Sequence, residues 1–284
     1  MSAASIGARR FDVLAGEIRK LPAFLRRDFL VAWSYKLAFV SGWVNLLVQT
    51  FLFYFVSRLV DTSKLPTFAG RRPGYMEFVI VGIVVSSFLQ IGLSRVVTAI
   101  RNEQLIGTLE SLLMTPTSPA TLQLGLVFYD LFYVPLRTFL FLGGASLLFG
   151  LDMHFNGLVP AVAVLLAFIP IVWGLGVTST AAMLTFRHGL GLVGIGGTLI
   201  TLLSGAYFPI GLLPDWAVRI SAFNPMKITL DAAREVLLGR GGWDEVLPAL
   251  AVLIPMGLVA LFVGVAAFRL ALARERRRGT LGMY

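Results

Sequence analysis

The side chains that could do chemistry are few and scattered in this chain of 284 residues. There is no cysteine, so thiolate metal sites, cysteine nucleophiles and disulfides are all excluded. The two histidines are His154 and His188, and only His154 has a neighbouring carboxylate, Asp152. No Ser/His/Asp set and no pair of carboxylates faces one site. We therefore expect no metal site and no enzymatic activity in the chain itself.

A nucleotide site is not expected either. A phosphate-binding loop needs a lysine directly after a glycine, and none of the four lysines has one: Lys20, Lys36, Lys64 and Lys227. The run Gly189-Leu-Gly191-Leu-Val-Gly194 fits the dinucleotide pattern G-x-G-x-x-G, but it opens an apolar stretch instead of following a strand. We interpret it as close helix packing, either within the chain or against a second copy.

Two charged residues and three tyrosines lie within apolar stretches and are candidates for a translocation path. Asp130 and Arg137 are seven residues apart, two helical turns along one face. Ionisable residues inside a membrane mark a pathway or a buried structural charge, and both interpretations stay open here. Tyr54, Tyr129 and Tyr133 could line a path for an amphipathic molecule, although interfacial packing is the simpler interpretation.

The composition predicts what must position these residues. The chain is 57% hydrophobic and 14% charged, whereas soluble domains carry about 25% charged residues. A spanning helix needs about 20 apolar residues. We therefore predict an all-α integral membrane protein with six transmembrane helices, at 37–59, 76–94, 122–149, 158–184, 190–208 and 246–270.

Basic residues gather before the first span and after the sixth, which predicts that both termini are cytoplasmic. Residues 1–36 form a cytoplasmic arm, 37–270 the transmembrane domain and 271–284 a basic tail. Lys64, Arg71 and Arg72 are a mild exception to this distribution of basic residues, because they fall in a loop predicted on the side of the membrane opposite the cytoplasm. We assign the net charge of +9 to membrane lipid headgroups and expect no nucleic-acid partner.

Two further segments have recognisable patterns. Leu14, Ile18, Leu21, Leu25 and Phe29 recur at helical spacing, which predicts an amphipathic helix in the cytoplasmic interface, with Pro22 kinking it or starting a second helix. The proline-rich stretch 205–245 suits short re-entrant helices in the outer leaflet, between spans five and six. Within it, Asn224-Pro225 is typical of a turn or helix start.

The most specific pattern lies in the connector 101–119, on the cytoplasmic side. Leu105, Leu109 and Leu112 form an apolar stripe, and Glu103 and Glu110 fall elsewhere on the helix. Thr115-Pro116 then ends the helix. Such a short amphipathic helix could dock a soluble partner.

This connector resembles the cytoplasmic signature of type-2 ABC exporter permeases, and the stretches Ser204–Pro209 and Leu213–Trp216 resemble the segment before that family's last span. The N-terminal run Arg26-Arg27-Asp28 also fits the family. The resemblance implies a coupling helix that docks on a separate ATP-binding subunit, which would hold ATP and magnesium, and a second copy of the chain. The docking residues it implies are Arg101, Glu103, Gly107, Thr108, Leu109, Glu110, Thr115 and Pro116, with Arg187 as a smaller contact.

By this resemblance the protein is a permease subunit in the cell inner membrane. It would export an amphipathic lipid-like, drug-like or glycan substrate, without binding a cofactor itself. A self-contained secondary transporter or channel, driven by ion gradients, is the alternative, with Asp130 and Arg137 as its first candidates. An intramembrane enzyme ranks last, because no catalytic set is present.

Overall fold

The computed structural model describes residues 36–60, 62, 65–106, 119–185, 189–239 and 241–278, and six positions of the arm: 22, 25, 26, 29, 30 and 34. These residues are almost entirely helical, and their one β-bridge joins Phe68 and Arg71. The all-α prediction is therefore confirmed. The elements are α3 (Lys36–Ser57), α4 (Tyr75–Ile106), α6 (Pro119–Phe149), η2 (Phe155–Gly157), α7 (Leu158–Thr185), α8 (Gly189–Leu202), η3 (Ile210–Leu212), α9 (Asp215–Ser221), α10 (Pro225–Leu237) and α11 (Trp243–Arg278).

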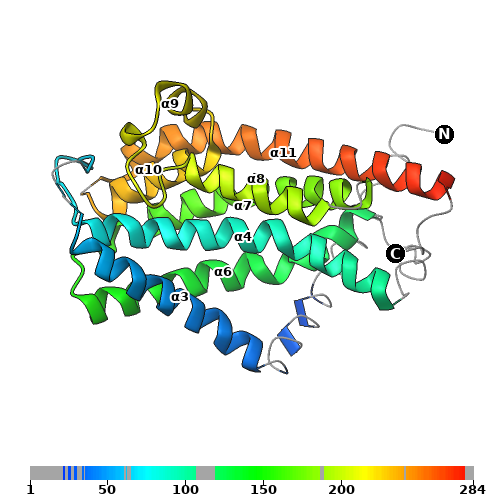
Figure 1. Cartoon of the computed structure of the whole chain (residues 1–284), viewed down its shortest axis with the longest axis horizontal. Helices are drawn as coiled ribbons and strands as arrows, with labels where there is room; N and C mark the ends of the chain where they lie inside the picture. The colour runs from blue at the N-terminus through cyan, green and yellow to red at the C-terminus, as the bar shows by residue number, and fades with distance from the viewer. Residues whose placement is uncertain are drawn as a thin grey trace, which may run out of the picture.

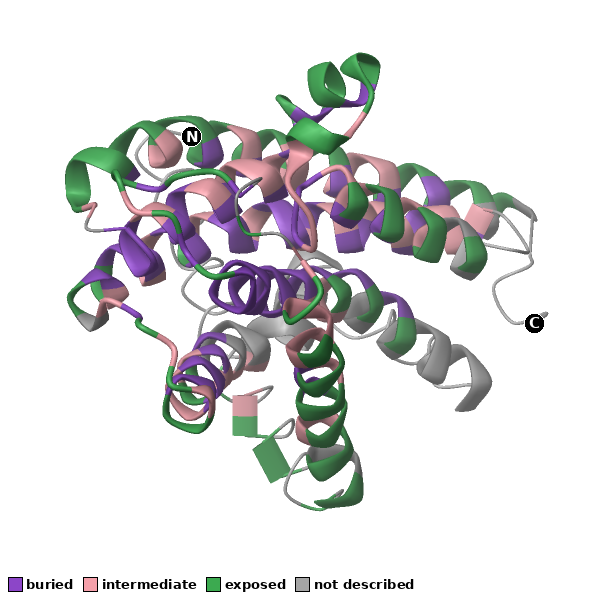
Figure 2. Ribbon diagram, turned by 60° about the vertical axis from the view of Figure 1, so that its left-hand side comes forward, coloured by how far each residue is buried: buried purple, intermediate pink, exposed green. Residues whose placement is uncertain are grey.

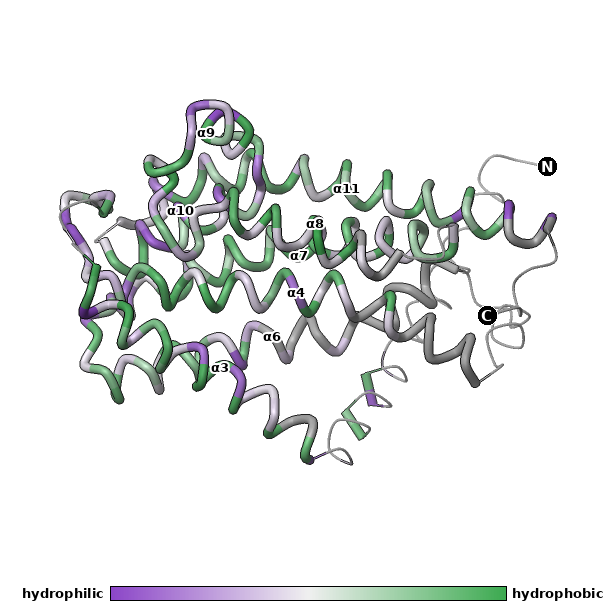
Figure 3. Tube along the Cα trace, viewed as in Figure 1, coloured by the Kyte–Doolittle hydropathy of each residue, from purple (hydrophilic) through white to green (hydrophobic). Residues whose placement is uncertain are grey.

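The long helices lie side by side along the long axis of the molecule, and successive ones run in opposite directions (Figure 1). The short helices α9 and α10 sit at the end where α4 and α11 begin, which we call the α10 end. Helix α3 inclines away from the bundle toward its own start. Hydrophobic residues follow the helices and hydrophilic ones gather mostly at the two ends (Figure 3).

Four of the described helices are long and apolar enough to cross a membrane, within Val40–Ser57, Tyr75–Ser94, Leu158–Thr185 and Trp243–Arg274. Their number makes this a multi-pass membrane protein. Among the residues whose side chains are described, α6 and α8 contribute the apolar stretches Pro135–Phe149 and Val193–Leu202. Six spans were predicted, and within the described residues four of them meet the criteria of length and hydropathy.

The predicted fifth span, 190–208, is wrong at its end. Helix α8 stops at Leu202 after 14 residues, so it is about 21 Å long against a hydrocarbon core of about 30 Å. Gly205 has a φ of +73°, a left-handed conformation that a helix does not contain. The apolar composition continues past this turn, which is why hydropathy alone overextended the helix.

Burial separates the helices into a core and a periphery (Figure 2). In the apolar window of α4, 78% of the residues are buried, whereas only 11% are buried in that of α3. The outer surfaces of α3 and α11 expose large apolar side chains such as Phe55 and Phe262. Contiguous apolar surfaces of this kind need a cover, which for this protein is lipid or another chain.

The largest contact between helices joins α7 and α11. A side chain on Gly174 of α7 would collide with the backbone of Ala260, and one on Gly264 would come within 2.6 Å of the Gly174 carbonyl oxygen. Ala260 and Gly264 are four residues apart on one face of α11. This arrangement of small residues lets two helix backbones approach closely, as is typical of packing inside membranes.

Candidate functional site

Helix α4 extends well beyond the span predicted from hydropathy. That span ends at Ser94, but the helix continues to Ile106, which adds about 18 Å of helix with Arg95, Arg101 and Glu103 in its sequence. Positions 101 and 103 of the predicted docking set lie on this extension. The predicted coupling segment 101–119 therefore starts as the last turns of α4, and not as a separate helix.

The remaining docking residues lie outside the described part of the chain. They are Gly107, Thr108, Leu109, Glu110, Thr115, Pro116 and Arg187. All of these residues except Arg187 belong to the segment that connects α4 to α6. Its two ends are fixed, because α4 ends at Ile106 and α6 begins at Pro119. The coupling helix stays a prediction.

Three of the predicted path residues share one face of α6. Tyr129 and Tyr133 are stacked, with ring centroids 5.3 Å apart and planes 16° from parallel. Arg137 follows one turn later, and its Nη2 donates a 2.6 Å hydrogen bond to the carbonyl oxygen of Gly42 in α3. Its guanidinium carbon also lies 5.7 Å from the ring centroid of Trp43. Arg137 thus joins α6 to α3 through the backbone, which makes it at least a structural contact.

The side chain of Asp130, predicted on the same face as Arg137, lies outside the described residues. Gly42 contributes to the observed contact, since a Cβ atom there would lie 3.3 Å from Nη2 of Arg137. The missing side chain leaves the carbonyl oxygen accessible to the guanidinium.

Tyr54 lies apart from the other path candidates. Its hydroxyl accepts a 2.6 Å hydrogen bond from Nη2 of Arg58, and its ring centroid is 5.2 Å from that of Phe149. Phe149 is the last residue of α6, about 24 Å along that helix from Tyr133. The structure therefore groups Tyr129, Tyr133 and Arg137 and separates Tyr54 from them.

A cluster of charged residues at the α10 end was not predicted. Nη2 of Arg71 lies 3.1 Å from Oε1 of Glu77 and 3.2 Å from Oδ2 of Asp152. Its Nη1 donates to the carbonyl oxygens of Asp152 and Leu238. Glu77, which is buried, also accepts hydrogen bonds from the backbone of Gly74 and Asp152.

This cluster joins the loop before α4, the loop before α7 and the end of α10. Arg71 was one of the basic residues that did not fit the predicted orientation in the membrane. The cluster gives it a structural role, since Arg71 contacts two carboxylates. The sequence contained a signal for it, because Glu77 is a single acidic residue in the first turn of an apolar span, six residues after an arginine.

Arg234 of α10 is the second feature that the sequence did not reveal. Its side chain is fully buried, and its three nitrogens donate four hydrogen bonds to the carbonyl oxygens of Phe78, Gly205 and Ala206, at 3.0–3.3 Å. Burial lowers the pKa of Arg234 to about 9, and the nearby charge of Asp231 opposes that shift. The guanidinium is therefore cationic at neutral pH.

Asn224 connects the same region to α8. Its Oδ1 accepts a 3.0 Å hydrogen bond from the backbone nitrogen of Met226, which caps the N-terminus of α10, and its Nδ2 donates to the carbonyl oxygen of Ile200. Pro225 occupies the first turn of the helix. The helix start predicted at Asn224-Pro225 is confirmed.

Apolar helices that can cross a membrane several times, held together at one end by buried charges, define a multi-pass integral membrane protein. The chain matches the ABC-2 type transporter family over residues 19–238, well over half of its length. It therefore belongs to the ABC-2 type transporter family, which confirms the resemblance to type-2 permeases. The search of curated proteins found no match.

Proposed function

We propose that this chain is the permease subunit of an ATP-driven exporter, in which two copies form the path for an amphipathic lipid-like, drug-like or glycan substrate. Membership of the ABC-2 family makes it an ABC transporter permease and implies an ATP-binding partner in general. In this proposal the partner binds ATP and magnesium, and the permease itself binds no cofactor and catalyses no reaction. The complex lies in the cell inner membrane, with both termini of the permease in the cytoplasm.

The extension of α4 past its predicted span is the observation that carries the proposal. A helix that continues about 18 Å past that span can transmit movement of a soluble subunit to the bundle, because α4 is also the most buried of the candidate spans. Movement at Ile106 would reach the core directly. The segment from Glu103 to Pro116 docks on the ATP-binding subunit, and Arg187 makes the smaller contact.

The glycines of α8 support a pairing of two permease copies. Gly197 faces inward, where a Cβ atom would come within 2.8 Å of Leu93, whereas Gly191, Gly194 and Gly196 have open space around them. Ile195 and Leu199 are exposed on the same helix. Gly191 and Gly194, three residues apart, lie on one side of α8, and this open face can accept a second copy at short distance. The helices η3, α9 and α10 dip into the outer leaflet beside it.

The test is affinity purification of the full-length chain from its native cells in mild detergent. We expect an ATP-binding subunit at equal stoichiometry, and we expect its loss when Glu103 and Glu110 are both changed to Lys. The control replaces the exposed Asp215 and Asp244, at the opposite end of the bundle, by Lys. The control should keep the partner, since it changes the net charge equally.

Recovery of the chain alone, or only with itself, would contradict the proposal. Ion-driven transport through α6 would then be the function to test, and Asp130→Asn would be its first variant. Glu110→Gln makes a finer test of coupling, because it should leave ATP hydrolysis in the complex but reduce transport. Unchanged transport in that variant would count against a coupling role for Glu110.

A further inference from the structure

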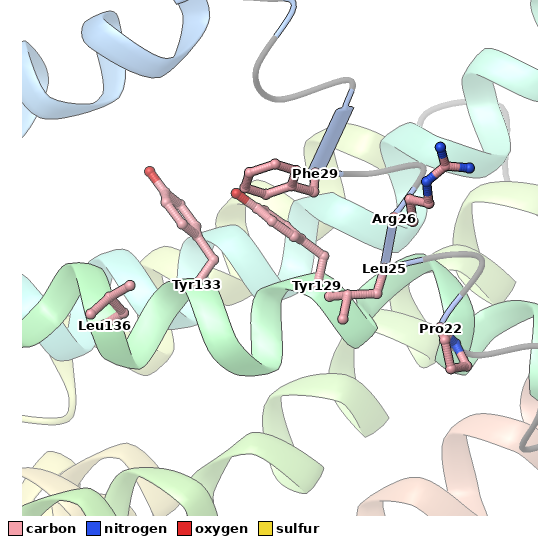
Figure 4. A pocket seen from close by; sticks show the side chains of 7 residues that line it. All are labelled: Pro22, Leu25, Arg26, Phe29, Tyr129, Tyr133 and Leu136. Atoms are coloured by element: carbon pink, nitrogen blue, oxygen red, sulfur yellow. The ribbon is translucent and has the colours of Figure 1, made fainter.

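A pocket of about 470 Å³ lies between the N-terminal arm and α6. The arm contributes Pro22, Leu25, Arg26 and Phe29, and α6 contributes Tyr129, Tyr133 and Leu136. Figure 4 shows the side chains of Leu25 and Phe29 on either side of the Tyr129 ring. The pocket is lined almost entirely by carbon atoms.

The two ends of the pocket differ in polarity. Leu136 lies at one end, and Arg26 and Pro22 lie at the other, where the guanidinium of Arg26 points away from the apolar side chains (Figure 4). Arg26 is exposed, and no hydrogen bond or ion pair to it occurs among the described residues. A cationic group therefore stands at the mouth of an elongated apolar pocket.

The apolar end is continuous with the outer surface of the bundle. Leu136 at this end is 58% exposed, and Leu140, one turn further along α6, is also 58% exposed. In a membrane such side chains face hydrocarbon. A molecule could enter this pocket from the side, out of the lipid, without passing through water.

We propose that the pocket binds an anionic phospholipid, with an acyl chain along Leu25, Tyr129 and Leu136 and the phosphate on Arg26. The apolar lining matches the chain, and the arginine matches the charge of the headgroup. A neutral drug would leave Arg26 without a partner, and a free phosphate would leave the apolar walls exposed. The bound lipid would fix the arm against α6, and this holds whether or not transport is driven by ATP.

Photolabelling of the purified full-length chain in detergent tests this inference. The probe is a phosphatidylglycerol with a photoreactive group near the end of one acyl chain, and a phosphatidylcholine with the same chain is the reference. We expect phosphatidylglycerol to label peptides that contain residues 22–30 and 129–136 about fivefold more strongly, the preference that one arginine near the surface provides. The neutral variant Arg26→Gln should lose this preference.

Leu136→Trp should fill the apolar end and reduce labelling by both lipids. Leu140→Trp is the matched control, because Leu140 is equally exposed on the same helix but does not line the pocket. Equal labelling by the two lipids in the wild-type chain would overturn the assignment of Arg26 to a headgroup. Unchanged labelling in Leu136→Trp would overturn the pocket as the binding site.

Discussion

Arg234 lies directly over the ring of Phe78, with its guanidinium carbon 3.6 Å from the ring centroid. The same arginine donates two hydrogen bonds, from Nε and Nη2, to the carbonyl oxygen of Phe78. It also reaches the carbonyl oxygen of Ala206, which packs against Gly82 where any side chain would collide with it. A residue of α10 thus joins the first turns of α4 to the turn that follows α8. Backbone carbonyls and an aromatic face replace the carboxylate that buried arginines usually need.

Arg234→Ala should lower the free energy of unfolding by about 3 kcal/mol, because several buried carbonyl oxygens would lose a charged donor. The free energy of unfolding of Arg234→Lys should lie between those of Arg234→Ala and the wild type. An ammonium group keeps the charge but lacks the planar arrangement of donors. Thermal unfolding of the purified chain in detergent measures both. The exposed Arg219→Ala is the control. Equal melting temperatures for Arg234→Ala and Arg219→Ala would contradict the role of Arg234.

Glu77→Ala should weaken the cluster of charged residues around Arg71 at the α10 end. The carboxylate holds Arg71 and two backbone amides, and its removal leaves those donors unsatisfied. We expect a loss of about 2 kcal/mol, together with faster amide hydrogen exchange in the loops 65–74 and 150–154. Exchange followed by mass spectrometry checks this, with the exposed Asp215→Ala as control. A uniform change over the whole chain would show that the effect is not local.

The sequence was sufficient to predict the fold class and the family, but not the contacts that fix the helices. Hydropathy identified all the long helices, because apolar residues must run continuously through a membrane. It could not find the end of α8, since Gly205 changes the backbone direction without changing hydropathy. Asn224-Pro225 was read correctly because a helix cap is a local signal.

The candidate site was predictable only in part, for a similar reason. Spacing along one helix predicted Asp130 and Arg137 on one face, and the structure adds that Tyr129 and Tyr133 are stacked, with Arg137 one turn further along α6. Tyr54 was included among the path candidates only because it is a tyrosine within an apolar stretch. In the structure it lies beside Phe149 at the end of α6, far from Tyr129 and Tyr133. Arg234 and Phe78 are far apart in the sequence, and nothing local signals that a charged residue of α10 is buried against α4.

Gly264→Leu should separate α7 from α11. The new side chain would meet the carbonyl of Gly174, and the helices would have to move apart. Overpacking of this kind costs about 1–3 kcal/mol. Gly144→Leu on α6 is the control, because a Cβ atom there meets nothing within 4 Å. Comparison of the two melting temperatures in detergent tests the packing, and a control that is equally destabilised would refute it.

Glu235→Gln should change how stability depends on pH. Burial raises the pKa of Glu235, a hydrogen bond with the backbone of Ala69 opposes the shift, and the charges of Glu245 and Asp231 support it. The folded chain therefore holds this proton more tightly than the unfolded chain, and wild-type stability falls as the pH rises from about 4.5 through the raised pKa.

Glutamine has no proton to lose, so the variant should unfold at a higher temperature than the wild type at pH 7. The difference should shrink as the pH is lowered toward 4.5. Asp215→Asn, at an exposed position, removes the same charge and should show no such trend. Parallel curves for wild type and Glu235→Gln would contradict the assignment.

Gly194→Leu tests the proposed pairing of two permease copies through α8. The position is open within one chain, so the substitution should leave the fold and the melting temperature unchanged. If α8 faces a second copy, the leucine side chain would hold the two backbones apart. The yield of crosslinked dimer in native membranes should then fall severalfold, with the introduced reporter cysteine Leu199→Cys as the crosslinking site.

Gly143→Leu is the matched control, because Gly143 is equally free of neighbours but lies on α6. A dimer yield that falls in the α8 variant and not in the α6 variant would support the interface. If both variants dimerise like the wild type, the open face of α8 contacts lipid, and the second copy must bind elsewhere. The exposed apolar surface of α3 would then be the next candidate, because so little of it is buried within one chain.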